Sequence, residues 1–206
     1  NLVSKPSERG LSSAGYWQNL LRRNVLERLV KAEGRLLEIG CGEGLFLSQL
    51  SELNPHLRLF GIERSALVLS AAQRRLNKNI RLVSSDAGRL PFKDAYFELA
   101  VGVNLFICVE SMDVLAEILR EAARVLRQGA KLIIEFRNKG NIFLKLKYGL
   151  ARYYDSTTEK HPLSAYYKKD ILMILDEAGF SVSKIEEIDF PLKGLPAIFV
   201  LEADRL

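Results

Sequence analysis

The chain has 206 residues, of which 48% are hydrophobic and 27% are charged, and its formal net charge is +5. This length suits one domain with a sizeable core, and the composition is that of an ordinary globular protein. The mild positive charge permits an acidic partner, but a solvated surface has the same balance. No apolar run is long enough to span a bilayer, and the first residues lack the order of a signal peptide.

Cysteine usage is sparse. Cys41 and Cys108 are the only two cysteines, and their spacing matches no metal-ligand pattern. We therefore expect no disulfide framework, no metal site and a location in the reducing cytoplasm.

The N-terminal segment, residues 1–34, is expected to be a polar lead-in followed by a helix. Apolar side chains recur at helical spacing from about residue 14 to residue 31. They are Trp17, Leu20, Leu21, Val25 and Leu29. Tyr16 and Trp17 stand at the start of this helix, where aromatic side chains can act as plain core anchors.

A glycine-rich turn after an apolar strand is the most informative stretch. The strand over 36–39 contains Glu38, and Gly40, Gly42 and Gly44 follow at every second position before a helical pattern begins. Glycine is needed where φ is positive or where a ligand approaches the main chain closely. The helix N-terminus beside the turn favours an anionic or carboxylate-bearing ligand.

The order E-x-G-x-G-x-G differs from the dinucleotide fingerprint G-x-G-x-x-G, and its acid suits a ligand with a positive charge better than a pyrophosphate. The turn resembles motif I of the class I S-adenosylmethionine-dependent methyltransferases, of the small-molecule, methyltransferase domain 11 type. The resemblance implies a main-chain cradle for the methionine part of S-adenosylmethionine, made by Gly40, Cys41, Gly42 and Gly44. It also implies that Glu38 fixes the turn and that an aromatic such as Tyr16 closes over the cofactor.

The second predicted strand, over 57–62, is followed by Glu63, and Ser65 is a plausible N-cap for the helix that comes next. A carboxylate here can accept hydrogen bonds from ribose hydroxyls, or it can simply complement the dipole of that helix. The resemblance implies the ribose role. Arg64 stands where the family more often has an apolar residue against adenine, so a guanidinium would stack there instead.

The third predicted strand, over 80–84, leads to Asp86, which could merely cap a turn. The resemblance implies that the Asp86 carboxylate accepts from the adenine amino group and that the main-chain N–H of Ala87 donates to the ring. The stretch D-A-x-x-L-P-F, which begins at Asp86, and the aromatic-rich fourth strand over 96–103 are typical of the small-molecule branch.

Asn104 follows the fourth strand, where the resemblance places its carbonyl against the ammonium group of the cofactor. The sequences N-P-P-Y and D-P-P-Y are absent, which argues against planar amide or base amino nitrogens as acceptors. Cys108 stands about where many relatives carry a histidine. No ready general base is therefore present, and we expect Cys108 to be a small buried apolar residue.

A helix over 112–127, closed by Gly129, and a buried strand over 131–136 continue the alternation of helices and strands. Such alternation predicts a parallel sheet whose ligand lies at the carboxyl ends of the strands. The glycine-rich turn and the polar residues after the second, third and fourth strands all lie at such ends.

Residues 138–164 interrupt the alternation with apolar and aromatic residues interleaved with cations. This insertion can be a lid over the site, a contact for a membrane surface or RNA, or a packed connection, and part of it is expected to be a short amphipathic helix. His161 lies within it, and its unperturbed pKa suits acid–base chemistry. It is a catalytic candidate beside Tyr16, although a lone loop histidine is more often a surface residue.

The chain ends in a helix over 167–178 and strands over 181–188 and 197–202, whose short connection predicts an antiparallel last strand. The expected fold is one α/β domain over residues 1–206, with a Rossmann-like, doubly wound, mostly parallel sheet of seven strands. We expect an S-adenosylmethionine-dependent methyltransferase that modifies an oxygen or nitrogen of a small molecule and releases S-adenosylhomocysteine. An RNA methyltransferase using the cationic residues 145–152 and a non-catalytic nucleotide-binding relative remain alternatives.

Overall fold

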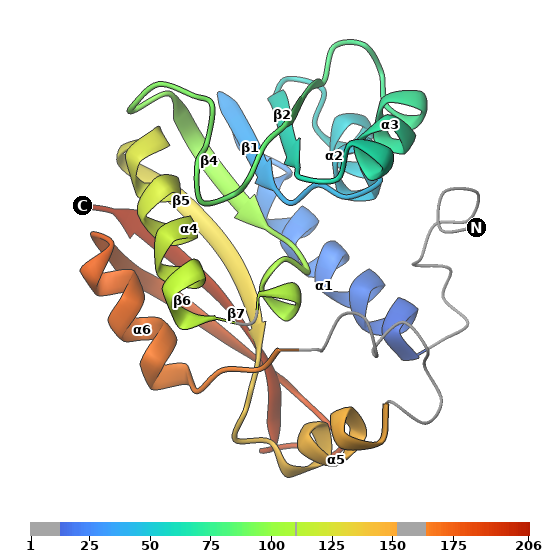
Figure 1. Ribbon diagram of the computed structural model, residues 1–206, viewed down its shortest axis with the longest axis vertical. Coiled ribbons are helices and arrows are strands. Elements are labelled where there is room, and N and C mark those ends of the chain that lie inside the picture. Colours follow the sequence, from blue (N-terminus) through green and yellow to red (C-terminus); the bar gives the residue numbers. More distant parts are fainter. Residues whose placement is uncertain (1–12, 110, 152–163) are drawn as a thin grey trace.

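A computed structural model describes residues 13–109, 111–151 and 164–206 (Figure 1). The strands are β1 (Arg35–Ile39), β2 (Arg58–Glu63), β3 (Arg81–Ser84), β4 (Phe97–Gly102), β5 (Leu126–Arg137), β6 (Phe180–Asp189) and β7 (Pro196–Arg205). The helices are α1 (Ser13–Leu29), α2 (Leu45–Leu53), α3 (Ala66–Arg75), α4 (Met112–Val125), α5 (Ile142–Ala151) and α6 (Lys168–Glu177), with a short 3-10 helix η1 (Phe106–Cys108).

The seven strands form one sheet in the order β3-β2-β1-β4-β5-β7-β6. Strands β1 to β5 pair in parallel, and β7 lies antiparallel to both β5 and β6. The mostly parallel sheet with an antiparallel last strand is therefore confirmed. The short β6–β7 connection inserts β7 between β5 and β6.

Successive residues of the central strands enter opposite hydrophobic layers, because side chains alternate across a sheet. On one face, Leu37 and Ile39 pack with α4 and α6. On the other face, Leu36 packs with α1 and α2. Both faces of the sheet are covered, which leaves the strand ends as the place for polar chemistry.

Two local expectations have clear outcomes. Ser65 caps α3, and its hydroxyl accepts a hydrogen bond from the Val68 N–H at 3.4 Å. The helix expected to run to residue 127 ends instead at Val125, because Tyr96 N–H donates to its carbonyl at 2.7 Å and Leu126 pairs with Phe97. Gly129, expected to close that helix, lies inside β5 with a φ of 73°.

Across the residues that the structure describes, no helix combines the length and apolar character needed to cross a membrane. Within the same residues, no three His, Cys, Asp or Glu side chains gather as a metal site would require.

Candidate active site at the carboxyl edge of the sheet

The carboxyl ends of β1, β2 and β3 lie level with one another. The register pairs Ile39 with Ile62 and Glu63 with Ser84. Main-chain bonds continue past the strands, from Cys41 N–H to the Ile62 carbonyl at 2.8 Å and from Ser85 N–H to the Glu63 carbonyl at 3.2 Å. The sheet therefore brings the glycine-rich turn, Glu63 and the loop of Asp86 to one edge, as the sequence predicted.

The three glycines of the turn share a backbone conformation but differ in their surroundings. All three have positive φ, at 75° for Gly40, 52° for Gly42 and 77° for Gly44. A Cβ on Gly40 would lie 2.8 Å from Leu105 Cδ1, and one on Gly44 would lie 2.6 Å from Leu76 Cδ1. A Cβ on Gly42 would meet no atom within 4 Å. Positive φ favours glycine at all three positions, and a Cβ at either outer position would also displace a leucine side chain, while the middle glycine faces open space where a ligand can reach the main chain.

Glu63 holds the turn. Its Oε2 accepts a hydrogen bond from Gly42 N–H at 3.2 Å, and its Oε1 accepts one from Ser65 N–H at 2.8 Å. The carboxylate is half-buried, and an ionised carboxylate has about four acceptor positions. It can therefore keep both of these bonds and still accept from a ligand in the space beside Gly42.

Glu38 places a buried carboxyl below the same turn. Its side chain is almost fully buried, and no described residue donates a hydrogen bond to its Oε2. Burial raises its pKa well above the usual range, and the nearby positive charge of Arg22 on α1 opposes this shift. An unsatisfied buried acceptor is costly, so this oxygen is suited to a donor or cation supplied by a ligand.

Asp86 lies on the loop after β3 and caps its own turn. Its Oδ1 accepts from Gly88 N–H at 2.8 Å, while its Oδ2 lies 3.8 Å from Arg64 Nη1. Ala87 is half-buried against the layer that α4 covers. Arg64 is highly exposed, so it stands at the rim of the site rather than inside it.

Asn104 is held by two charged residues that sequence reasoning missed. Its φ of 56° is in the left-handed region, its N–H donates to Glu135 Oε1 at 2.7 Å, and its Oδ1 accepts from Arg137 Nη2 at 3.1 Å. Glu135 and Arg137 are buried at the end of β5 and form an ion pair with each other. The available signal was a pair of charges, two residues apart, that directly follows the apolar run over 132–134.

The two cysteines differ in their surroundings. Cys41 is buried in the layer under α1 and α2, so its main chain rather than its thiol belongs to the turn. Cys108 is exposed, and the expectation of a buried residue was wrong: η1 turns Phe106 into the core instead. The pKa of the Cys108 thiol is nevertheless raised, because neighbouring atoms displace water around it. A neutral thiol at this position is a poor general base.

Both catalytic candidates lie where the side chains are not described. Tyr16 is in α1, but only the main chain of that part is described. His161 lies outside the described residues, as does most of the second half of the 138–164 insertion. The first half of the insertion contains α5, so the expected short helix is confirmed.

Known methyltransferases resemble this chain in sequence. Residues 37–134 match the family model described as a methyltransferase domain. The chain is 27% identical over 174 residues to a malonyl-[acyl-carrier protein] O-methyltransferase of Paenibacillus sp., a match that covers 78% of this chain and 61% of that protein. Over 58 residues it is 38% identical to a tRNA (guanine-N(7)-)-methyltransferase of Desulfitobacterium hafniense, covering 26% of this chain and 27% of that protein. The chain thus spans less than two thirds of the length of each relative.

Among solved structures, magnesium protoporphyrin IX methyltransferase from Synechocystis with bound S-adenosylhomocysteine has the same fold. The TM-score is 0.71 at 18% sequence identity, and the match covers 92% of this chain and 84% of that chain. The doubly wound sheet with β7 inserted antiparallel is thus shared with a solved methyltransferase structure. The chain is therefore similar to S-adenosylmethionine-dependent methyltransferases in the sequence of residues 37–134 and in its fold.

Proposed function

We propose that this chain binds S-adenosylmethionine at the carboxyl edge and transfers its methyl group to an oxygen or nitrogen of a small molecule. The observation that carries the proposal is the open space at Gly42, next to a carboxylate that already binds the Gly42 N–H. A Cβ would fill this space, so the turn is built for close approach of a ligand to the main chain.

The residues present fit this cofactor. The main chain of the glycine-rich turn would hold the methionine part, and Glu38 Oε2, which has no donor among the described residues, would fix the turn from below. Glu63 would accept from the ribose hydroxyls, Asp86 and Ala87 would contact adenine, and the Asn104 carbonyl would accept from the ammonium group. When bound, the cofactor supplies a methyl group that its positive sulfur has already activated.

Since the methyl group arrives activated, the chain's own task is to position the acceptor and exclude water. Asn104 is fixed for this by Glu135 and Arg137, which hold its main-chain N–H and its side chain at once. The Cys108 thiol, with its raised pKa, does not supply a base there. An acceptor that has lost its proton before transfer, or that loses it to solvent afterwards, fits this arrangement.

The small-molecule class is supported by the D-A-x-x-L-P-F stretch and by the similarity to a malonyl-[acyl-carrier protein] O-methyltransferase. The second candidate, an RNA acceptor, is supported by the shorter match to a tRNA methyltransferase and by a sequence pI of about 9.2. Labelled donor incubated with separated small-molecule and RNA fractions distinguishes the two. Label in the RNA fraction alone would replace our proposal with the second candidate, and label in neither fraction would favour the non-catalytic relative.

The cofactor site is tested by comparing Gly42→Ala with Gly129→Ala. Both glycines have positive φ, at 52° and 73°, and a Cβ on either would meet no protein atom within 4 Å. Each variant should therefore carry a similar backbone strain of about 1–2 kcal/mol. Calorimetry with S-adenosylhomocysteine should show binding weakened roughly tenfold or more in Gly42→Ala, which is about 1.4 kcal/mol, and near-normal binding in Gly129→Ala. Equal affinities in the two variants would refute the site.

A further inference from the structure

Five exposed apolar side chains gather on two neighbouring segments at one end of the molecule. On α5 they are Ile142, Phe143 and Leu146, with exposed fractions of 69%, 41% and 61%, and on the β6–β7 turn they are Leu192 and Leu195, with 65% and 37%. We call these five residues the α5 patch. Figure 1 shows α5 beside the β6–β7 turn, beyond the end of β5. Single exposed apolar residues are ordinary, but a cluster of them marks a contact surface.

Hydrogen bonds from two asparagines lock the two segments together. Asn141 Nδ2 donates to the Phe190 carbonyl at 2.9 Å, and Asn138 Nδ2 donates to the Pro196 carbonyl at 2.7 Å. Asn141 also caps α5, because its Oδ1 accepts from the N–H groups of Phe143 and Leu144 at 3.0 Å each. The patch is therefore held on a defined framework, with Leu144 buried beneath it.

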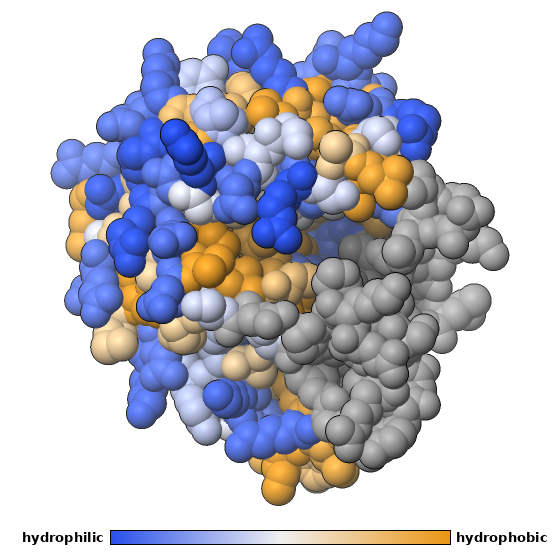
Figure 2. All heavy atoms as spheres, in the orientation of Figure 1, coloured by the Kyte–Doolittle hydropathy of each residue, from blue (hydrophilic) through white to orange (hydrophobic). Residues whose placement is uncertain are grey.

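The patch has a cationic surround. Lys139 precedes α5, Lys145 lies on α5 and Lys193 lies on the β6–β7 turn, and all three are exposed. Asp189 is the only acid within 138–146 and 189–196, and its Oδ2 accepts from Gly194 N–H at 2.7 Å. Figure 2 shows strongly apolar and strongly polar residues side by side at the lower end of the molecule. Lysine side chains can keep their ammonium groups in water while their stems lie along apolar surface.

We propose that the α5 patch docks on the surface of an anionic lipid bilayer. Aliphatic side chains of this kind enter the boundary between headgroups and acyl chains, while flanking lysines are attracted to the lipid phosphates and acidic headgroups. Nucleic acid suits the patch less well, because single-stranded nucleic acid binds through stacking on aromatic rings and four of the five exposed residues are aliphatic. This docking does not depend on the methyl-transfer function, and it would place the carboxyl end of β5 near the lipid.

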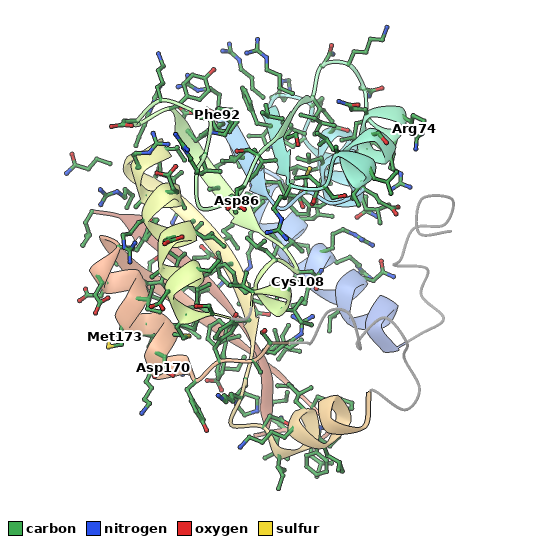
Figure 3. The ribbon with its side chains drawn as sticks, viewed as in Figure 1. Arg74, Asp86, Phe92, Cys108, Asp170 and Met173 are labelled. Carbon is green, nitrogen blue, oxygen red and sulfur yellow. The ribbon has the colours of Figure 1, made fainter. Side chains whose placement is uncertain are left out.

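The test is co-sedimentation of the chain with vesicles of phosphatidylcholine alone or with added phosphatidylglycerol. The patch variant is Ile142→Glu with Leu146→Glu. Ile142 directly follows the Asn141 cap, where a carboxylate favours the helix, so α5 should persist. The control, Leu67→Glu with Met173→Glu, adds the same charge at exposed residues of α3 and α6. Figure 1 shows both helices away from α5, and Figure 3 labels Met173 on α6. Circular dichroism checks that all variants fold.

We expect the unaltered chain and the control to bind the phosphatidylglycerol vesicles, and the patch variant to stay in the supernatant. Changing Lys145 and Lys193 together to Gln should weaken this binding roughly thirtyfold, and added salt should weaken it further. Equal binding to both kinds of vesicle, or equal loss in the patch variant and the control, would overturn the proposal. So would a dimer of the unaltered chain in solution that only the patch variant abolishes, since the patch would then serve a second copy.

Discussion

The two halves of the sheet, β3-β2-β1 and β5-β7-β6, carry different features, and these features differ in how far the sequence predicts them. On the side of β1, β2 and β3, the site is made by main chain and by short carboxylate side chains at strand ends. On the side of β5, β7 and β6 lie the helix α5 and its exposed patch. The match to the methyltransferase domain stops at residue 134, inside β5.

This difference teaches that a main-chain cradle is easier to read from a sequence than a side-chain surface. Gly40 favours glycine because its φ is 75° and because a Cβ would displace the side chain of Leu105. The α5 patch, in contrast, needs only apolar side chains that face outward, and many residue types can supply them. The two sides meet at Asn104, which follows β4 and is held from β5 by Glu135 and Arg137.

The largest expected effect on stability comes from breaking the ion pair between Glu135 and Arg137. Arg137→Met leaves Glu135 buried without its charge partner, which should lower the free energy of unfolding by about 3–5 kcal/mol. Urea unfolding measures the loss. The double variant Glu135→Gln with Arg137→Met removes the uncompensated charge and should recover part of the stability. A loss below about 1 kcal/mol in the single variant would mean that the ion pair does not hold the two sides together.

A smaller effect is expected from Glu63 on the cofactor side. Glu63→Ala removes the acceptor for Gly42 N–H and the proposed acceptor for ribose, so affinity for S-adenosylhomocysteine should fall by about 1–3 kcal/mol. Glu63→Gln keeps one carbonyl oxygen as an acceptor and should lose less. Calorimetry on the two variants checks this order. Unchanged affinity in Glu63→Ala would remove Glu63 from the site.

At the opposite, amino edge of the sheet, the carboxylate of Glu98 provides a pH-dependent contrast. Hydrogen bonding to the Arg35 guanidinium lowers the pKa of Glu98 to about 2, and Arg127 Nη1 also lies 2.7 Å from its Oε1. Since the folded pKa is below the unfolded one, the stabilisation is complete above about pH 4.5 and is lost as the pH falls towards about 2.

After allowance for solvent screening of this partly exposed group, Glu98→Gln should cost about 1–2 kcal/mol near pH 7. Near pH 2 the variant and the unaltered chain should be almost equally stable. Urea unfolding at several pH values checks this, with the exposed Glu52→Gln as the control. An equal difference at both pH values would show that the carboxylate charge is not responsible.

Much of this architecture was predictable because it follows from local chemistry. The alternation of strands and helices, the glycine-rich turn and the Ser65 cap depend on residues near one another in the chain. The errors arose where distant partners decide the outcome. Tyr96 takes the carbonyl of Val125 and so ends α4 early, and the exposure of Cys108 depends on how η1 packs. The contacts of Asn104 with Glu135 and Arg137 depend on the pairing of β4 with β5, which the sequence around Asn104 does not reveal.

The smallest effect is expected at Arg64, on the rim of the cofactor side. Arg64 and Asp86 are both exposed and lie 3.8 Å apart, so Arg64→Ala should change the free energy of unfolding by less than about 0.5 kcal/mol. If the guanidinium stacks on adenine, affinity for S-adenosylhomocysteine should fall by about 0.5–1 kcal/mol at both low and high salt. If Arg64 instead only neutralises Asp86, Arg64→Ala should leave Asp86 freer to accept from adenine, and affinity should rise at low salt alone. Calorimetry at two salt concentrations, with Arg64→Lys as the charge-preserving control, separates stacking from pairing.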